Sequence, residues 1–101
     1  MMEIFKETMR SKPKIRIGKK SITDTKIEEI KNLINKHSMI KIKILQSKAD
    51  EIDLLIANIL SITKYNLLDI RGSSFVLSKK LVKNLRINNK CKKIISLSKN
   101  I

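Results

Sequence analysis

The alternation of apolar and basic residues over residues 39–45 limits most strongly how this chain can fold. The stretch reads Met39-Ile40-Lys41-Ile42-Lys43-Ile44-Leu45. Successive side chains of a strand point to opposite faces of a sheet. The pattern therefore predicts a strand whose isoleucines face a core and whose lysines face solvent, in a sheet that is covered on one side only.

A second stretch combines a strand, a glycine and a helix start. Residues 14–17 alternate in the same way, and this strand is expected to end at Gly18. Residues 19–21, which include two lysines, are expected to form a short loop, and a helix is expected to begin at Thr23 or Thr25. A helix start offers unpaired backbone N–H groups and the positive end of the helix dipole. Together with the lysines, they predict a phosphate-binding loop.

Three amphipathic helices and two further strands complete the predicted fold. Apolar residues recur at helical spacing over about 2–10, from Thr23 or Thr25 to His37, and over about 48–64. Strands are expected at about 66–71 and 74–79, joined by a type II′ turn at Gly72-Ser73. This order predicts an α/β two-layer sandwich, with a four-stranded mixed sheet and three helices on one face.

Residues 81–101 are predicted to be a basic C-terminal extension of a domain formed by residues 1–80. Lysines are frequent in this segment, and Asn88-Asn89 interrupt its apolar pattern. The apolar residues are too scattered to make a major part of the core. We therefore expect a flexible basic arm, and a domain that folds without it.

The charge balance of the chain points to a polyanionic partner. A net charge of +14 on 101 residues is costly in self-repulsion unless a polyanion relieves it. Basic side chains are expected on the uncovered sheet face, where they extend the loop site: Lys14, Arg16, Lys41, Lys43 and Arg71. For any single lysine, the alternative is that it only discourages strand pairing at an edge and keeps the chain soluble.

Catalysis, metal binding and membrane insertion find little support in the sequence. One cysteine and one histidine do not make a zinc site, and the acidic residues at 50, 51 and 53 suit the dipole at a helix start. We expect no enzymatic activity, no metal and no cofactor. The sequence has neither the ~18 apolar residues of a membrane span nor a signal peptide, so we expect a cytoplasmic protein without membrane contact.

Three sequence blocks, taken in order, resemble the CRM domain family and its YhbY-type single-domain members. They are the strand-glycine-helix junction, the run from Lys36 to Lys43, and the run from Ile70 to Leu77. The resemblance covers about residues 2–80. It implies an RNA-binding α/β fold similar to the C-terminal domain of a bacterial translation initiation factor. It also implies binding to structured RNA, namely precursor ribosomal RNA of the large subunit.

The resemblance assigns a role to the loop after the first strand, where the family carries a Gly-x-x-Gly signature. Here the loop reads Gly18-Lys19-Lys20-Ser21, so serine replaces the second glycine. Serine adds bulk and resists positive φ angles, which affects how closely a sugar-phosphate chain can lie across the loop. Its hydroxyl can itself bond a phosphate oxygen.

We therefore predict a monomeric RNA-binding module that contacts the large ribosomal subunit or its precursor RNA. Its expected RNA-binding residues are Gly18, Lys19, Lys20, Ser21, Lys14, Arg16, Lys41, Lys43 and Arg71. The main alternative is an Alba-like nucleic-acid or chromatin-coating protein, whose first strand also tends to end in Ile-Gly-Lys-Lys, but whose hairpin at the Gly72 position is usually longer and basic. A protein-interaction module with an acidic partner is a second alternative.

Overall fold

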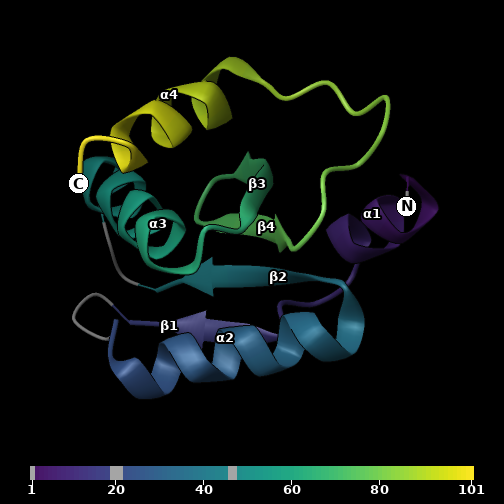
Figure 1. The fold of residues 1–101 in the computed structure, drawn as a ribbon, viewed down its shortest axis with the longest axis horizontal. Coiled ribbons are helices and arrows are strands. Elements are labelled where there is room, and N and C mark those ends of the chain that lie inside the picture. The colour runs from purple at the N-terminus through teal and green to yellow at the C-terminus, as the bar shows by residue number, and fades with distance from the viewer. Residues whose placement is uncertain (1, 19–21, 46–47) are drawn as a thin grey trace.

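The computed structural model describes residues 2–18, 22–45 and 48–101. Within them the chain forms an α/β fold with helices on both sides of a four-stranded sheet (Figure 1). The elements are α1 (Met2–Arg10), β1 (Ile15–Ile17), α2 (Asp24–His37), β2 (Met39–Ile44), α3 (Ala49–Thr63), β3 (Asn66–Arg71), β4 (Ser74–Ser78) and α4 (Asn89–Ser98). The predicted fold class is confirmed.

The sheet has the order β1-β2-β4-β3 and is mixed. β1 and β2 are parallel, whereas β4 is antiparallel to both β2 and β3. At the turn between β3 and β4, Gly72 has a φ of 58°, as the first central residue of a type II′ turn requires. A register shift between Leu67 and Asp69 marks a bulge in β3, which the sequence did not indicate.

The main core lies between one sheet face and helices α2, α3 and α4. Ile30 of α2, Ile56 of α3 and Ile94 of α4 are fully buried in it. α2 begins after Thr23, whose hydroxyl oxygen accepts a hydrogen bond from the Lys26 backbone N–H at 3.2 Å. Of the two residues at which the helix was expected to begin, Thr23 and Thr25, it is Thr23 that caps the N-terminus of α2.

The C-terminal segment packs into the domain, so the expectation of a flexible arm was wrong. The Asn88 side chain caps α4 by accepting from the Cys91 N–H at 2.9 Å. Cys91 and Ile94 are completely buried, and Val82 is 6% exposed. Burial raises the pKa of the Cys91 thiol to about 11, and the charge of Asp69 adds to the rise. Apolar residues at i and i+3 were enough to dock this helix despite the lysines between them.

Helix α1 lies against the opposite sheet face from the other helices. Its residues Met2, Phe5 and Met9 pack in a second, smaller cluster around Met39, Leu68, Val76 and Val82. The sequence analysis counted this helix among the three on one face. Three helices do cover that face, but the third is α4, and α1 covers part of the face that was expected to be open.

Candidate nucleic-acid interface

The strand register brings three cationic side chains into one row across the sheet. Arg16 is paired with Lys43, Lys43 with Ser74, and Ser74 with Arg71. Paired residues of neighbouring strands point to the same face. Strands are ~4.8 Å apart, so these four residues, which we call the basic row, span roughly 14 Å.

The basic row is accessible from solvent. Arg16 is exposed between the buried Ile15 and Ile17, and Lys43 is half-buried. The Arg71 side chain is 78% exposed, and its Nε lies 3.3 Å from Asp69 Oδ2. The guanidinium carries five N–H donors, so pairing with one carboxylate does not exhaust its capacity for a phosphate.

The start of the predicted phosphate loop lies at the edge of the sheet beside this row. The Leu45 N–H donates to the Ile17 carbonyl at 2.8 Å, and the Ile44 N–H donates to the Ser73 carbonyl at 2.8 Å. Gly18, which follows Ile17, is therefore near the end of β2 and the Gly72-Ser73 turn, and Figure 1 shows β1 and β2 ending on the same side.

The remaining loop residues fall outside the part of the chain that the structure describes. Lys19, Lys20 and Ser21 belong to this group. Their contacts with phosphate stay a prediction from the sequence. What the structure adds is the position from which the loop leaves the sheet, since Gly18 directly follows the strand that carries Arg16.

Lys41 holds the end of α1. Its Nζ donates to the Met9 carbonyl at 3.0 Å and to the Ser11 carbonyl at 3.3 Å. Carbonyls at the end of a helix lack partners within the helix, and a cation there also complements the dipole. Lys41 thus has a structural role that was not foreseen. Lys14 keeps an exposed side chain, and its backbone N–H donates to the Lys41 carbonyl at 2.8 Å.

Sequence reasoning missed Ser74 as a member of the basic row. The signal was available, because a two-residue hairpin turn at Gly72-Ser73 places Arg71 opposite Ser74. A hydroxyl can donate to a phosphate or ribose oxygen. Ser74 therefore adds a neutral donor between Lys43 and Arg71.

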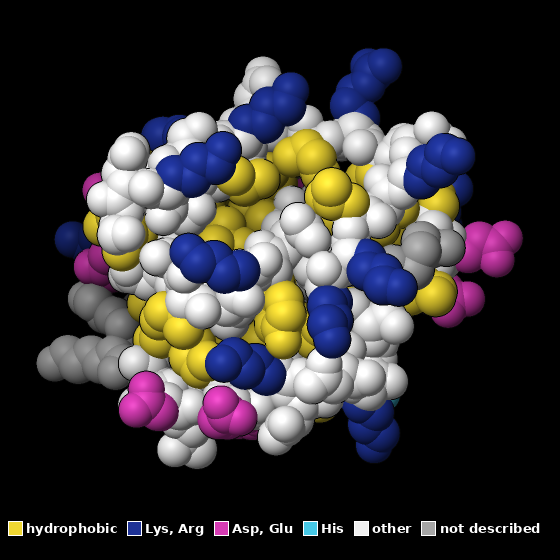
Figure 2. Space-filling view, viewed as in Figure 1, with side chains coloured by type: hydrophobic (Ala, Val, Ile, Leu, Met, Phe, Trp, Pro, Cys, Tyr) yellow, Lys and Arg dark blue, Asp and Glu magenta, His cyan; other side chains and the backbone are white. Residues whose placement is uncertain are grey.

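Positive charge extends well beyond the basic row. Figure 2 shows Lys and Arg side chains spread over the visible face, with Asp and Glu side chains near its margins. Such a distribution attracts polyanions without regard to sequence. Effects of single lysines on binding must therefore be compared with those of lysines elsewhere on the surface.

The described residues were searched for clusters of metal ligands and for membrane-spanning helices. No three His, Cys, Asp or Glu side chains among residues 2–18, 22–45 and 48–101 lie together as ligands for a metal ion. None of the described helices is both long and apolar enough to cross a bilayer.

Comparison with known proteins identifies a family and similar solved structures. The model of the CRS1 / YhbY (CRM) domain family matches residues 2–79. A hypothetical protein from Staphylococcus aureus, solved in solution and described as a proposed RNA-binding protein, has a TM-score of 0.66 and 23% sequence identity. That comparison covers 86% of this chain and 91% of the other. No curated protein matches the chain. The solved structure supports the fold.

Proposed function

The chain belongs to the CRS1 / YhbY (CRM) domain family, and we propose that it binds structured RNA, namely precursor ribosomal RNA of the large subunit. The observation that carries the proposal is the basic row, which lies on an accessible sheet face beside the start of the Gly18 loop. Phosphates of the RNA backbone contact the row, and the loop with the N-terminal amides of α2 holds a further phosphate.

The aromatic residues favour a structured RNA over an extended single strand. The chain has two phenylalanines, one tyrosine and no tryptophan. Phe75 is 1% exposed, and Phe5 and Tyr65 are partly buried against the two apolar clusters. Binding of single strands usually relies on stacking of bases on exposed aromatic rings. Recognition through backbone and shape suits a folded RNA better.

We also propose that the protein acts in the cytoplasm as a monomer, without catalytic activity or a cofactor. The burial of Cys91 argues against a role for this residue as a catalytic nucleophile, because a thiol whose pKa is raised to about 11 is a poor nucleophile at neutral pH. His37 lies in the last turn of α2, a position where histidine is common because its side chain can bond the last carbonyls of a helix.

Replacing Lys19 and Lys20 by alanine is expected to weaken RNA binding and to leave thermal stability unchanged. If each lysine contacts one phosphate, the slope of log affinity against log salt falls by about 1.4 on a single-stranded RNA region. Titrations at several salt concentrations measure this slope. A slope equal to that of the wild type would show that these two lysines do not contact the RNA.

The identity of the RNA is tested by crosslinking in a native extract, followed by sequencing of the bound RNA and of any bound DNA. We expect sequences from the precursor of the large-subunit ribosomal RNA. An even spread over cellular RNA and DNA would instead support an Alba-like coating protein. A partner protein that survives exhaustive nuclease treatment, with no enriched RNA, would support a protein-interaction module.

A further inference from the structure

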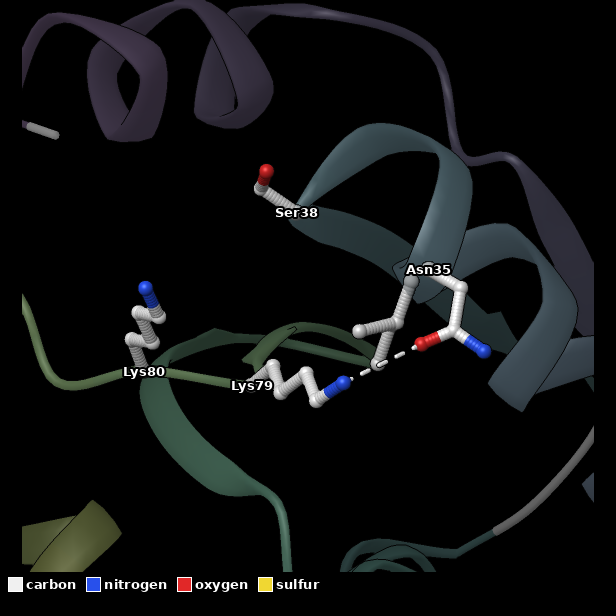
Figure 3. Close-up of a pocket in the computed structure, with 5 residues that line it drawn as sticks. Asn35, Ser38, Lys79 and Lys80 are labelled. Carbon is white, nitrogen blue, oxygen red and sulfur yellow. Dashed lines mark hydrogen bonds between the residues drawn. The ribbon is translucent and has the colours of Figure 1, made fainter.

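A second basic site lies at the other end of β2, away from the Gly18 loop. It is a pocket with a volume of about 190 Å³, between the C-terminal end of α2 and the end of β4 (Figure 3). The residues that line it are Ile34, Asn35, Ser38, Lys79 and Lys80. None of these residues carries a carboxylate. The volume is below the ~300 Å³ at which sites for drug-sized ligands begin, so it suits a single small group.

Hydrogen bonds from neighbouring side chains hold the backbone of Lys79 and Lys80 in place. Ser78 is completely buried, and its hydroxyl donates to the Lys80 carbonyl at 2.6 Å and accepts from the Lys80 N–H at 3.2 Å. The Asn66 side chain donates to the Lys79 carbonyl at 3.2 Å. The exposed lysines thus project from an ordered turn, which lowers the entropy lost when they bind a ligand.

Ser38 adopts an unusual backbone conformation at this pocket. Its φ is 72°, a value that residues with a side chain rarely adopt. Its N–H donates to the Ile34 carbonyl at 2.8 Å, and its carbonyl accepts from the Lys79 N–H at 3.4 Å. Ser38 is the residue at which α2 ends, and a positive φ is common at that position, so the end of the helix fixes where Ser38 lies at the pocket.

The side chains around the pocket can supply several hydrogen-bond donors. Lys79 Nζ lies 3.5 Å from Asn35 Oδ1. Figure 3 shows Lys79 reaching toward Asn35, with Lys80 and Ser38 at other sides of the open space. Two ammonium groups and a hydroxyl, with no acid among the lining residues, match the requirements of a phosphate.

We propose that Ser38, Lys79 and Lys80 bind a phosphate group of the RNA, as a second anchor distinct from the basic row. The proposal rests on the RNA-binding function proposed above. A simpler role for Lys79 is to complement the dipole at the end of α2. That role does not account for Lys80, whose backbone is held by the buried Ser78.

The two anchors are separated along β2. Met39 follows Ser38 at the pocket, and Lys43 belongs to the basic row. Four residues of a strand cover roughly 13 Å. An RNA that occupies both anchors must span this distance. Linked contacts raise the effective concentration at the second anchor, so the pocket contributes more on a long structured RNA than on a fragment that reaches one anchor.

The test compares two double variants that remove the same charge. Lys79→Ala/Lys80→Ala alters the pocket, and Lys92→Ala/Lys93→Ala removes two exposed lysines from α4. The probe is one RNA hairpin, prepared with a 5′-hydroxyl or a 5′-monophosphate. For the pocket variant we expect the slope of log affinity against log salt to fall by about 0.7–0.9, the value for one phosphate contact, and for the control variant a markedly smaller change. Equal changes in both variants would overturn the proposal.

The two forms of the probe identify the source of the phosphate. If the pocket variant loses affinity equally for both hairpins, the pocket binds a backbone phosphate. If it loses affinity only for the 5′-monophosphate form, the pocket binds a terminal phosphate. If the wild-type protein does not bind the hairpin and no other RNA is captured from extract, the proposed function itself fails. If the wild type binds the hairpin and the pocket variant binds it equally well, the pocket proposal is wrong while the proposed function stands.

Ser38→Gly provides a variant that does not threaten the fold. Glycine adopts φ values near 72° without strain, so thermal stability should stay equal or rise. Loss of the hydroxyl should nevertheless lower affinity for the hairpin by about threefold, in keeping with one neutral hydrogen bond. Unchanged affinity in this stable variant would remove Ser38 from the site.

Discussion

Removal of residues 81–101 is expected to unfold the protein. The truncation takes away Val82, Cys91 and Ile94, whose side chains are buried, and it uncovers apolar surface of α3 and β3. Loss of one large buried aliphatic side chain costs ~2–5 kcal/mol. The whole stability of a domain is ~5–15 kcal/mol. Circular dichroism of the truncated chain should show little cooperative thermal transition.

A single substitution tests the same packing without removing the segment. Ile94→Ala should destabilise the protein by about 2–4 kcal/mol, which lowers the melting temperature by roughly 4–8 °C for each kcal/mol. Lys93→Ala, at an exposed neighbouring position, serves as control and should stay within about 0.5 kcal/mol of the wild type. A truncated chain that melts cooperatively at the wild-type temperature would contradict the packing of α4.

Loss of the three cations of the basic row is expected to have the largest effect on RNA binding. In the triple variant Arg16→Ala/Lys43→Ala/Arg71→Ala, the slope of log affinity against log salt should fall by about 2–3, from ~0.7–0.9 for each phosphate contact. Fluorescence anisotropy with a labelled RNA hairpin measures affinity at each salt concentration. Thermal stability should change little, since none of the three side chains belongs to a buried cluster.

The matched control for the row removes three exposed lysines from the C-terminal segment: Lys83, Lys92 and Lys93. Both triple variants lose the same net charge, so long-range attraction falls equally in both. Lys41 is left out of the row variant because its Nζ bonds to carbonyls at the end of α1. Equal slopes in the two triple variants would indicate general electrostatics rather than a defined surface.

Periodicity predicted most of the elements, because a strand or helix with one buried face leaves a direct trace in the sequence. The alternation at residues 39–45 and the glycine turn at Gly72-Ser73 are examples. The side of the sheet on which α1 docks was not predictable in this way. An apolar stripe shows that a helix packs, but it does not say against which sheet face. Met39 and Val76 supply that second apolar face.

The candidate site was predictable only in part. Arg16, Lys43 and Arg71 were identified from strand alternation, while their alignment in one row depends on the strand order β1-β2-β4-β3. The role of Lys41 depends on where α1 docks, and the pocket at Lys79 and Lys80 depends on a buried serine. Lys41 and α1 are far apart in the chain, as are the two segments that line the pocket, so no local sequence pattern predicts that they meet.

RNA binding at the basic row is tested most directly by nuclear magnetic resonance of the ¹⁵N-labelled full chain, titrated with an RNA hairpin. Backbone amide shifts report the contacted surface residue by residue. We expect the largest changes at Gly18 and at the row residues Arg16, Lys43, Arg71 and Ser74, with small changes on the outer surfaces of α3 and α4. Changes concentrated on those two helices, with the row unaffected, would contradict the proposed interface.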